Sequence, residues 1–145
     1  MLRPLTDTHS EIHTIVRSYY ERVPRQRILI PVVALIECLK GHVNVLGRDE
    51  ALHMVVKKYS IFGDYYAFLR SHDIAQFDGE AASIYESLSG SGGVQDRRIA
   101  AIALRHRCKV VTRNVEHFLS AGLPPEFVVN WTVKEEFLTD DIRTY

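Results

Sequence analysis

Three residues with side-chain oxygens adjoin apolar segments at widely separated points of the chain, and they are the best candidates for chemistry. Glu37 follows the apolar run 28–33, Asp96 stands at the mouth of an apolar helix, and Asn114 ends a short apolar strand. In a parallel α/β sheet such positions share the rim outside the carboxyl ends of the strands. Carboxylate and amide oxygens suit Mg²⁺ and Mn²⁺. The sequence therefore predicts an acidic pocket for a hard divalent cation, built from Glu37, Asp96 and Asn114.

A cation held at such a rim supplies water activation and charge neutralisation for cleavage of a phosphodiester bond. Basic residues lie close to the candidate acids in sequence, and Arg97, Arg98 and Arg113 are candidates for contacts with substrate phosphates. A solvated helix face with basic residues near its C-terminus explains the same cluster equally well. Both interpretations stay open.

The elements that must position these residues alternate between helix and strand. Apolar residues at helical spacing indicate helices, and short β-branched runs indicate strands. Helices are expected over 8–23, 34–46, 48–70 with a break near Gly63, from 78 to about 88, from 96, and in a turn through Phe118; strands are expected over 28–33, 74–77, 110–111 and near 127–130. The alternation predicts a parallel sheet with helices on its faces. The aromatic residues of segment 48–70 suit base stacking, but they suit a core or a dimer surface better.

Composition narrows the class of protein. A chain of 145 residues fits a single domain, and 46% hydrophobic with 25% charged residues are values of a globular protein. Eighteen basic residues balance eighteen acidic ones, which argues against a protein that coats nucleic acid by bulk charge. Cys38 and Cys108 lack metal-site spacing and fit a reducing cytoplasm. No apolar run reaches the length of a membrane helix.

The ordered combination of three motifs resembles the PIN-domain ribonucleases, in particular the VapC-type toxins of bacterial and archaeal toxin-antitoxin pairs. The first motif spans 36–41, where an acid stands four residues before a glycine. The second is Asp-Arg-Arg-Ile-Ala-Ala at 96–101, and the third is Val-Thr-Arg-Asn at 111–114 with Phe118. Segment 77–82 is also similar to the family. The likeness covers about residues 24–133.

The resemblance implies an α/β protein with a three-layer α/β/α PIN-like fold around a central parallel sheet, as a single domain over residues 1–145. It implies an endoribonuclease that depends on Mg²⁺ or Mn²⁺, acts on RNA, forms a homodimer and is inhibited by an antitoxin protein. On this interpretation Glu37 and Asp96 hold the metal, and Asn114 contributes a ligand or orients water. Which RNA is cut and which antitoxin binds are not readable from the sequence.

The chain departs from the family pattern at two places. The family begins with a strand that ends in an aspartate, and here no apolar strand precedes the first helix, so the first strand and its acid are expected to be missing. The hypothesis that follows is that Met1 corresponds to a residue just after that motif. Asp7 is the alternative acid, although a helix-capping role suits it better. His117 is the second departure, because the family often has an aspartate there.

Plainer interpretations remain for each residue. Glu37 fits an ordinary helix acid, Asp96 a helix N-cap, and Asn114 a cap of the turn toward Phe118. At the level of the protein, the main alternative is a catalytically silent PIN-like chain that retains only antitoxin binding or dimerisation. A domain that binds a small phosphorylated ligand is the third possibility, but no glycine-rich phosphate loop supports it.

Overall fold

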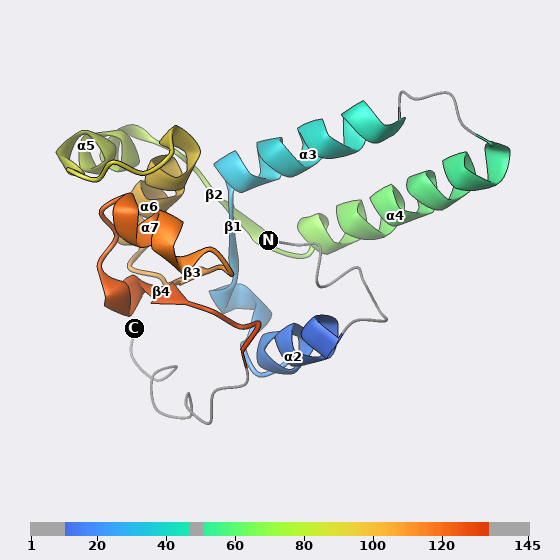
Figure 1. The fold of residues 1–145 in the computed structure, drawn as a ribbon, viewed down its shortest axis with the longest axis horizontal. Coiled ribbons are helices and arrows are strands. Elements are labelled where there is room, and N and C mark those ends of the chain that lie inside the picture. Colours follow the sequence, from blue (N-terminus) through green and yellow to red (C-terminus); the bar gives the residue numbers. More distant parts are fainter. Residues whose placement is uncertain (1–10, 47–50, 134–145) are drawn as a thin grey trace.

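The computed structural model describes residues 11–46 and 51–133 (Figure 1). Asp7, the alternative first acid, lies outside the described residues. The elements in chain order are α2 (Glu11–Tyr20), η1 (Arg25–Arg27), β1 (Leu29–Pro31), α3 (Val32–Leu46), α4 (Leu52–Arg70), β2 (Asp73–Ala75), α5 (Gly79–Ser87), α6 (Val94–His106), β3 (Val110–Val111), α7 (Val115–Ser120), η2 (Pro125–Phe127) and β4 (Val128–Val129).

The strands form two parallel pairs, so the chain is a mixed α/β protein in which helices dominate. β1 pairs with β2, and β3 pairs with β4. The one continuous central sheet expected from the sequence is absent from the described residues, where each pair stands as a sheet of two strands. Pro31 explains part of the difference, because it has no N–H to donate and the chain turns into α3 directly after it.

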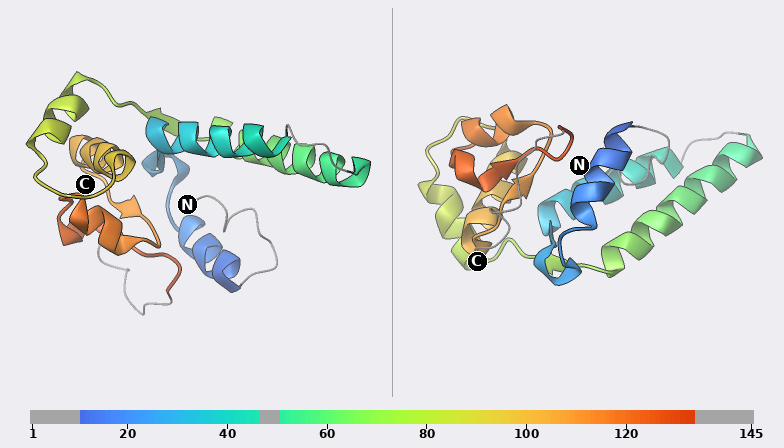
Figure 2. Two further views of the ribbon diagram at one scale, coloured as in Figure 1. Left: turned by 45° about the horizontal axis from the view of Figure 1, so that its top comes forward. Right: turned by 90° about the horizontal axis from the view of Figure 1, so that it is seen from below.

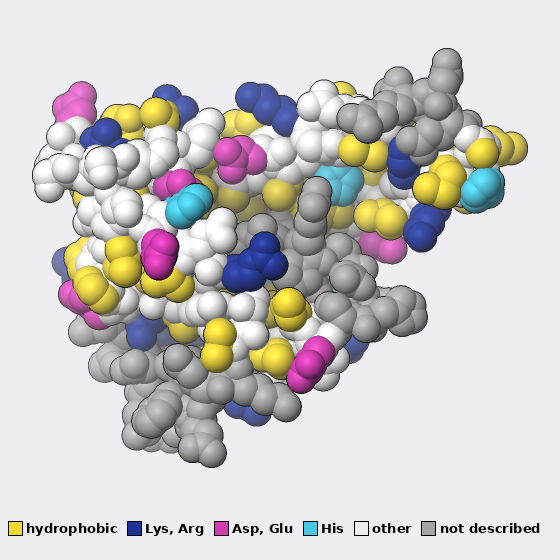
Figure 3. All heavy atoms as spheres, in the orientation of Figure 1, with side chains coloured by type: hydrophobic (Ala, Val, Ile, Leu, Met, Phe, Trp, Pro, Cys, Tyr) yellow, Lys and Arg dark blue, Asp and Glu magenta, His cyan; other side chains and the backbone are white. Residues whose placement is uncertain are grey.

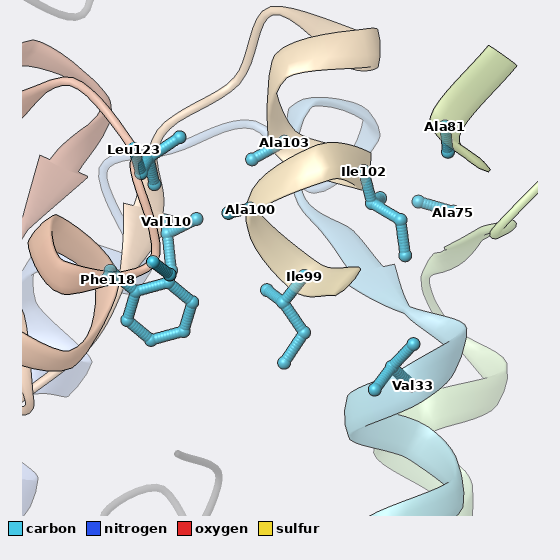
Figure 4. Packing of buried hydrophobic residues seen from close by; sticks show 11 residues of the cluster. Val33, Ala75, Ala81, Ile99, Ala100, Ile102, Ala103, Val110, Phe118 and Leu123 are labelled. Atoms are coloured by element: carbon cyan, nitrogen blue, oxygen red, sulfur yellow. The ribbon is translucent and has the colours of Figure 1, made fainter. Parts of the chain in front are cut away.

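The main core surrounds α6, whose alanines allow close approach. Ala100, Ala101 and Ala103 are buried, and Ile102 is 1% exposed. Figure 4 shows Val33 at the start of α3 opposite Ile99 of α6, and the core cluster continues through strands β2 and β3 and helix α7. One helix therefore packs against elements of both strand pairs. This explains how two short sheets belong to the same core.

Asp78 fixes the start of α5 as its N-cap. Its carboxylate accepts a hydrogen bond from the backbone N–H of Ala81 at 3.0 Å, and Arg105 of α6 donates to the same carboxylate at 2.9 Å. The Ala81 hydrogen bond, followed by Arg105, lowers the pKa of Asp78 below its usual value. The expected helix start at residue 78 is correct to within one residue. Asp78 thus ties α5 to α6.

Helices α3 and α4 form a hairpin that projects from the rest of the molecule (Figures 1 and 2). The break expected near Gly63 is wrong, because α4 continues through this residue. Its aromatic residues divide: Tyr65 is buried with its ring stacked on that of His42, whereas Tyr59 and Tyr66 are exposed. Burial, together with the neighbouring Cys38 thiol, raises the pKa of Tyr65.

Large apolar side chains are exposed along this hairpin. They are Ile36, Val43 and Val45 on α3, and Leu52, Met54, Val56, Tyr59, Ile61 and Tyr66 on α4. Exposed apolar side chains gathered on two neighbouring helices are found at interaction sites. We call these residues the hairpin surface. Over the residues that the structure describes, none of the helices combines the length and apolar character of a membrane span.

Candidate functional site

Helices α3 and α6, which carry the two candidate acids, pack against each other. Val33 and Ile99 belong to the same core cluster and face each other in Figure 4. Glu37 lies one turn after Val33 on α3, and Asp96 lies one turn before Ile99 on α6. Residues three or four apart share a helix face. Each acid therefore extends the face that makes the contact between the two helices.

Asp96 is the third residue of α6, inside its first turn. Gly93 is the N-cap, so the interpretation of Asp96 as an N-cap is wrong. The Asp96 side chain is 30% exposed, and its Oδ2 atom lies 3.7 Å from Nδ1 of His117. The positive end of the helix dipole favours a carboxylate here. Asp96 is thus held at the rim with its carboxylate accessible to solvent.

Glu37 is exposed on α3 and is the only acidic residue of that helix. Figure 3 shows an acidic side chain over the first half of α3 and, on the same face of the molecule, further acidic side chains beside a histidine over the α6–α7 region. A basic side chain, dark blue near the middle of the view, lies below these acidic groups. This face therefore combines the charges that a phosphate substrate and a cation require.

Asn114 precedes α7 as its N-cap but makes no side-chain capping hydrogen bond. Its backbone N–H donates to Oγ1 of Thr112 at 3.0 Å, which shapes the turn after β3. The cap role proposed for its amide is therefore not realised, and the side chain is exposed. Asn114 lies three residues before His117, which contacts Asp96.

The three candidate arginines have different surroundings. Arg97 donates from its Nη2 atom to the carbonyl oxygens of Leu88 at 2.8 Å and Tyr85 at 3.2 Å, and its guanidinium lies 4.6 Å from the centre of the Tyr85 ring. These contacts fasten α5 to α6, so we leave Arg97 out of the proposed phosphate contacts. Arg98 donates to Gln95 at 3.2 Å, and Arg113 is exposed after β3.

The segment 89–93, which consists of serine and glycine, packs tightly against the end of α7. The N–H of Gly92 donates to the carbonyl oxygen of Ser120 at 3.0 Å. A Cβ atom at Gly92 would lie 2.7 Å from both the N and the Cα of Ala121, and one at Gly90 would also overlap the Ala121 backbone. The two glycines are needed for this close approach, which leads the chain into α6.

Among the described residues, no three His, Cys, Asp or Glu side chains lie close enough to hold a metal by themselves. The three candidate residues, two carboxylates and one amide, stand on α3, in the first turn of α6 and directly before α7. Burial raises the pKa of Cys108, so this thiol stays protonated and does not suit metal binding. The contact between His117 and Asp96 was not predicted from the sequence. The position of His117, about one helical turn after Asn114, is the sequence feature that pointed to this region.

The chain matches no protein-family model, no curated protein and no solved structure. A proposal for its function therefore depends on the side-chain geometry and on the three motifs.

Proposed function

We propose that this chain is a metal-dependent endoribonuclease, the toxin of a toxin-antitoxin pair, with Mg²⁺ or Mn²⁺ held by Asp96 and Glu37. The observation that supports the proposal is that Val33 and Ile99 share one core cluster, with one candidate acid a single turn away from each on its helix. Asn114 and Arg113 stand in the turn after β3, before the helix whose His117 contacts Asp96. Two acids, an amide and a positively charged arginine side chain suit phosphodiester cleavage.

The donor set fits a hard divalent cation. Mg²⁺ usually takes one or two protein carboxylates, and waters and substrate phosphates fill its other positions. An open rim with two accessible carboxylates meets this requirement without a third acid. When bound, the cation supplies water activation and offsets the negative charge that develops on the phosphate oxygens.

The chain's own residues then divide the work. Asp96 and Glu37 hold the cation, and the Asn114 amide orients the attacking water or offers its oxygen as a further ligand. Arg113 and Arg98 neutralise flanking RNA phosphates, because a guanidinium donates well to phosphate oxygens. Water adds to phosphorus and releases one proton to solvent, the bond from phosphorus to one bridging oxygen breaks, and the leaving oxygen takes a proton from solvent.

The finer fold and the partners belong to the same proposal. The two parallel strand pairs that pack on α6 are compatible with a three-layer PIN-like fold in a single domain. The strand that would join them into one sheet is not among the described residues. We propose that the protein acts in the cytoplasm, that an antitoxin protein inhibits it, and that it forms a homodimer.

Cleavage of an unstructured RNA by the purified chain, with Mg²⁺ or Mn²⁺ titrated in, tests the proposal. We expect Asp96→Asn and Glu37→Gln each to lower the cleavage rate by roughly a hundredfold or more, because loss of a catalytic interaction usually costs at least that much. Glu86→Gln, at an exposed acid of α5, is the matched control and should cleave normally. Cleavage that survives Asp96→Asn or a chelator would refute the metal mechanism.

A silent protein that only binds a partner is the second candidate, and the hairpin surface favours it. Two helices with this many exposed large apolar side chains are unusual for a protein that acts as a monomer and typical of one that binds a partner. If the unmodified chain cuts no RNA at any metal concentration but sediments as a dimer that Val56→Glu dissociates, this candidate replaces the enzyme.

A further inference from the structure

His117 brings an imidazole nitrogen to the rim at which the cation is proposed to bind. Its Nδ1 atom lies 3.7 Å from Oδ2 of Asp96, and its side chain is 65% exposed. Two ligands of one cation, each roughly 2.1 Å from it, are separated by about 3.0 Å when adjacent and about 4.2 Å when opposite. The observed separation lies between these limits. One ion can therefore contact both atoms with little movement of either side chain.

A surface ion pair is the plainer explanation for this contact. Such pairs contribute little to stability when both partners are accessible to solvent, as they are here. The packing of α7 nevertheless fixes where the imidazole stands: Phe118 is buried in the core next to it, and Ala121 closes against the 89–93 segment. The His117 backbone is held by these neighbours, whereas its ring stays accessible. A ligand needs both properties.

We propose that His117 is itself a ligand of the cation, and that this rim consequently takes Mn²⁺ in preference to Mg²⁺. The inference rests on the proposed function, since it concerns the same cation. Imidazole binds first-row transition metals well, whereas Mg²⁺ selects oxygen ligands and waters. A neutral imidazole also adds no negative charge to the rim, which favours a hard cation less than a further carboxylate would.

The small number of protein ligands limits the affinity of this site for a metal ion. The described residues contain no group of three candidate ligands close enough to enclose a metal. Asp96 and His117 therefore provide direct bonds, Glu37 acts directly or through water, and waters or RNA phosphates take the other positions. We expect weak binding of Mn²⁺ to the free chain and tighter binding when RNA is present.

Electron paramagnetic resonance of Mn²⁺ tests the inference without an activity assay, because the signal of free Mn²⁺ falls as the ion binds. Mg²⁺ is then added to displace it from the full-length chain. We expect displacement from the unmodified chain to need at least tenfold more Mg²⁺, relative to Mn²⁺, than displacement from His117→Asp, whose rim carries only oxygen ligands. His53→Asp, at an exposed histidine of α4, is the matched control and should behave as the unmodified chain.

Two results would overturn the inference, and they separate it from the proposed function. If the unmodified chain binds Mn²⁺ and His117→Asp leaves the ratio of Mn²⁺ to Mg²⁺ affinity unchanged, His117 is no ligand, while the metal-dependent nuclease stands. If the unmodified chain and Asp96→Asn both leave the Mn²⁺ signal unaltered with RNA present, both proposals fail. His117→Gln gives the same comparison should the aspartate variant not fold: Mn²⁺ affinity falls if His117 is a ligand and stays if it is not.

Discussion

Gly92→Ala should destabilise the protein, although alanine is usually the better residue for a folded chain. The added Cβ atom would lie 2.7 Å from the N and Cα of Ala121, and 2.8 Å from its Cβ. Ordinary van der Waals contact needs about 1 Å more, and backbone atoms cannot rotate away as a flexible side chain can. Overpacking of this kind costs about 1 to 3 kcal/mol. The smaller entropy of the unfolded alanine chain offsets about 0.4 to 1 kcal/mol.

Because the overlap is with backbone atoms, we expect the cost of overpacking to lie in the upper half of its range. The net cost is then about 1 to 2.6 kcal/mol, which corresponds to a fall in Tm of about 2 to 10 °C for a domain of this size. Thermal unfolding followed by circular dichroism measures it. Gly63→Ala is the control, since nothing lies within 4 Å of its Cβ and it stands inside α4, so it should stabilise by about 0.5 to 1 kcal/mol. A Gly92→Ala protein as stable as the unmodified chain would refute the close packing of this segment on α7.

Three further outcomes follow from the core and from the contacts between α5 and α6. Ile102→Ala should cost about 2 to 5 kcal/mol in denaturant unfolding, because the residue is 1% exposed, whereas Leu52→Ala, at 77% exposed, should change stability by less than about 0.5 kcal/mol. Arg97→Ala should lower the unfolding free energy by about 1.5 to 3 kcal/mol, since it removes charged hydrogen bonds to two carbonyls; an unchanged urea midpoint would contradict this. The lowered pKa of Asp78 stabilises the fold above the ordinary aspartate pKa, and this contribution is lost as pH falls through the lowered value. Asp78→Asn should therefore flatten the dependence of the urea midpoint on pH between about 5 and 2, and an unaltered dependence would exclude this role.

Element positions were largely readable from the sequence because local signals were strong. The Val110–Val111 strand is confirmed, and α3, α5, α7 and β4 lie within a few residues of their expected places. Boundaries shifted where a neighbour decides them: α3 begins at Val32 because Pro31 ends the strand, and α6 begins at Val94 because Gly93 caps it. Both causes are local, and both residues are visible in the sequence.

The candidate site was readable in its residue types but not in its contacts. Asp96 and Glu37 stand on neighbouring helices only because α3 packs on α6, a contact between segments far apart in the chain. Arg97 has the same charge as Arg113, and only the fold directs it to the carbonyls of α5. Pairing of the strands into two separate sheets was equally unreadable, since it depends on long-range packing around α6.

The projecting hairpin also bears on solubility. A surface rich in valine, leucine and tyrosine side chains draws copies of the chain together as they become crowded. How much protein remains dissolved therefore depends on its concentration and on whatever covers α3 and α4, and a variant with a perfectly sound core can still precipitate.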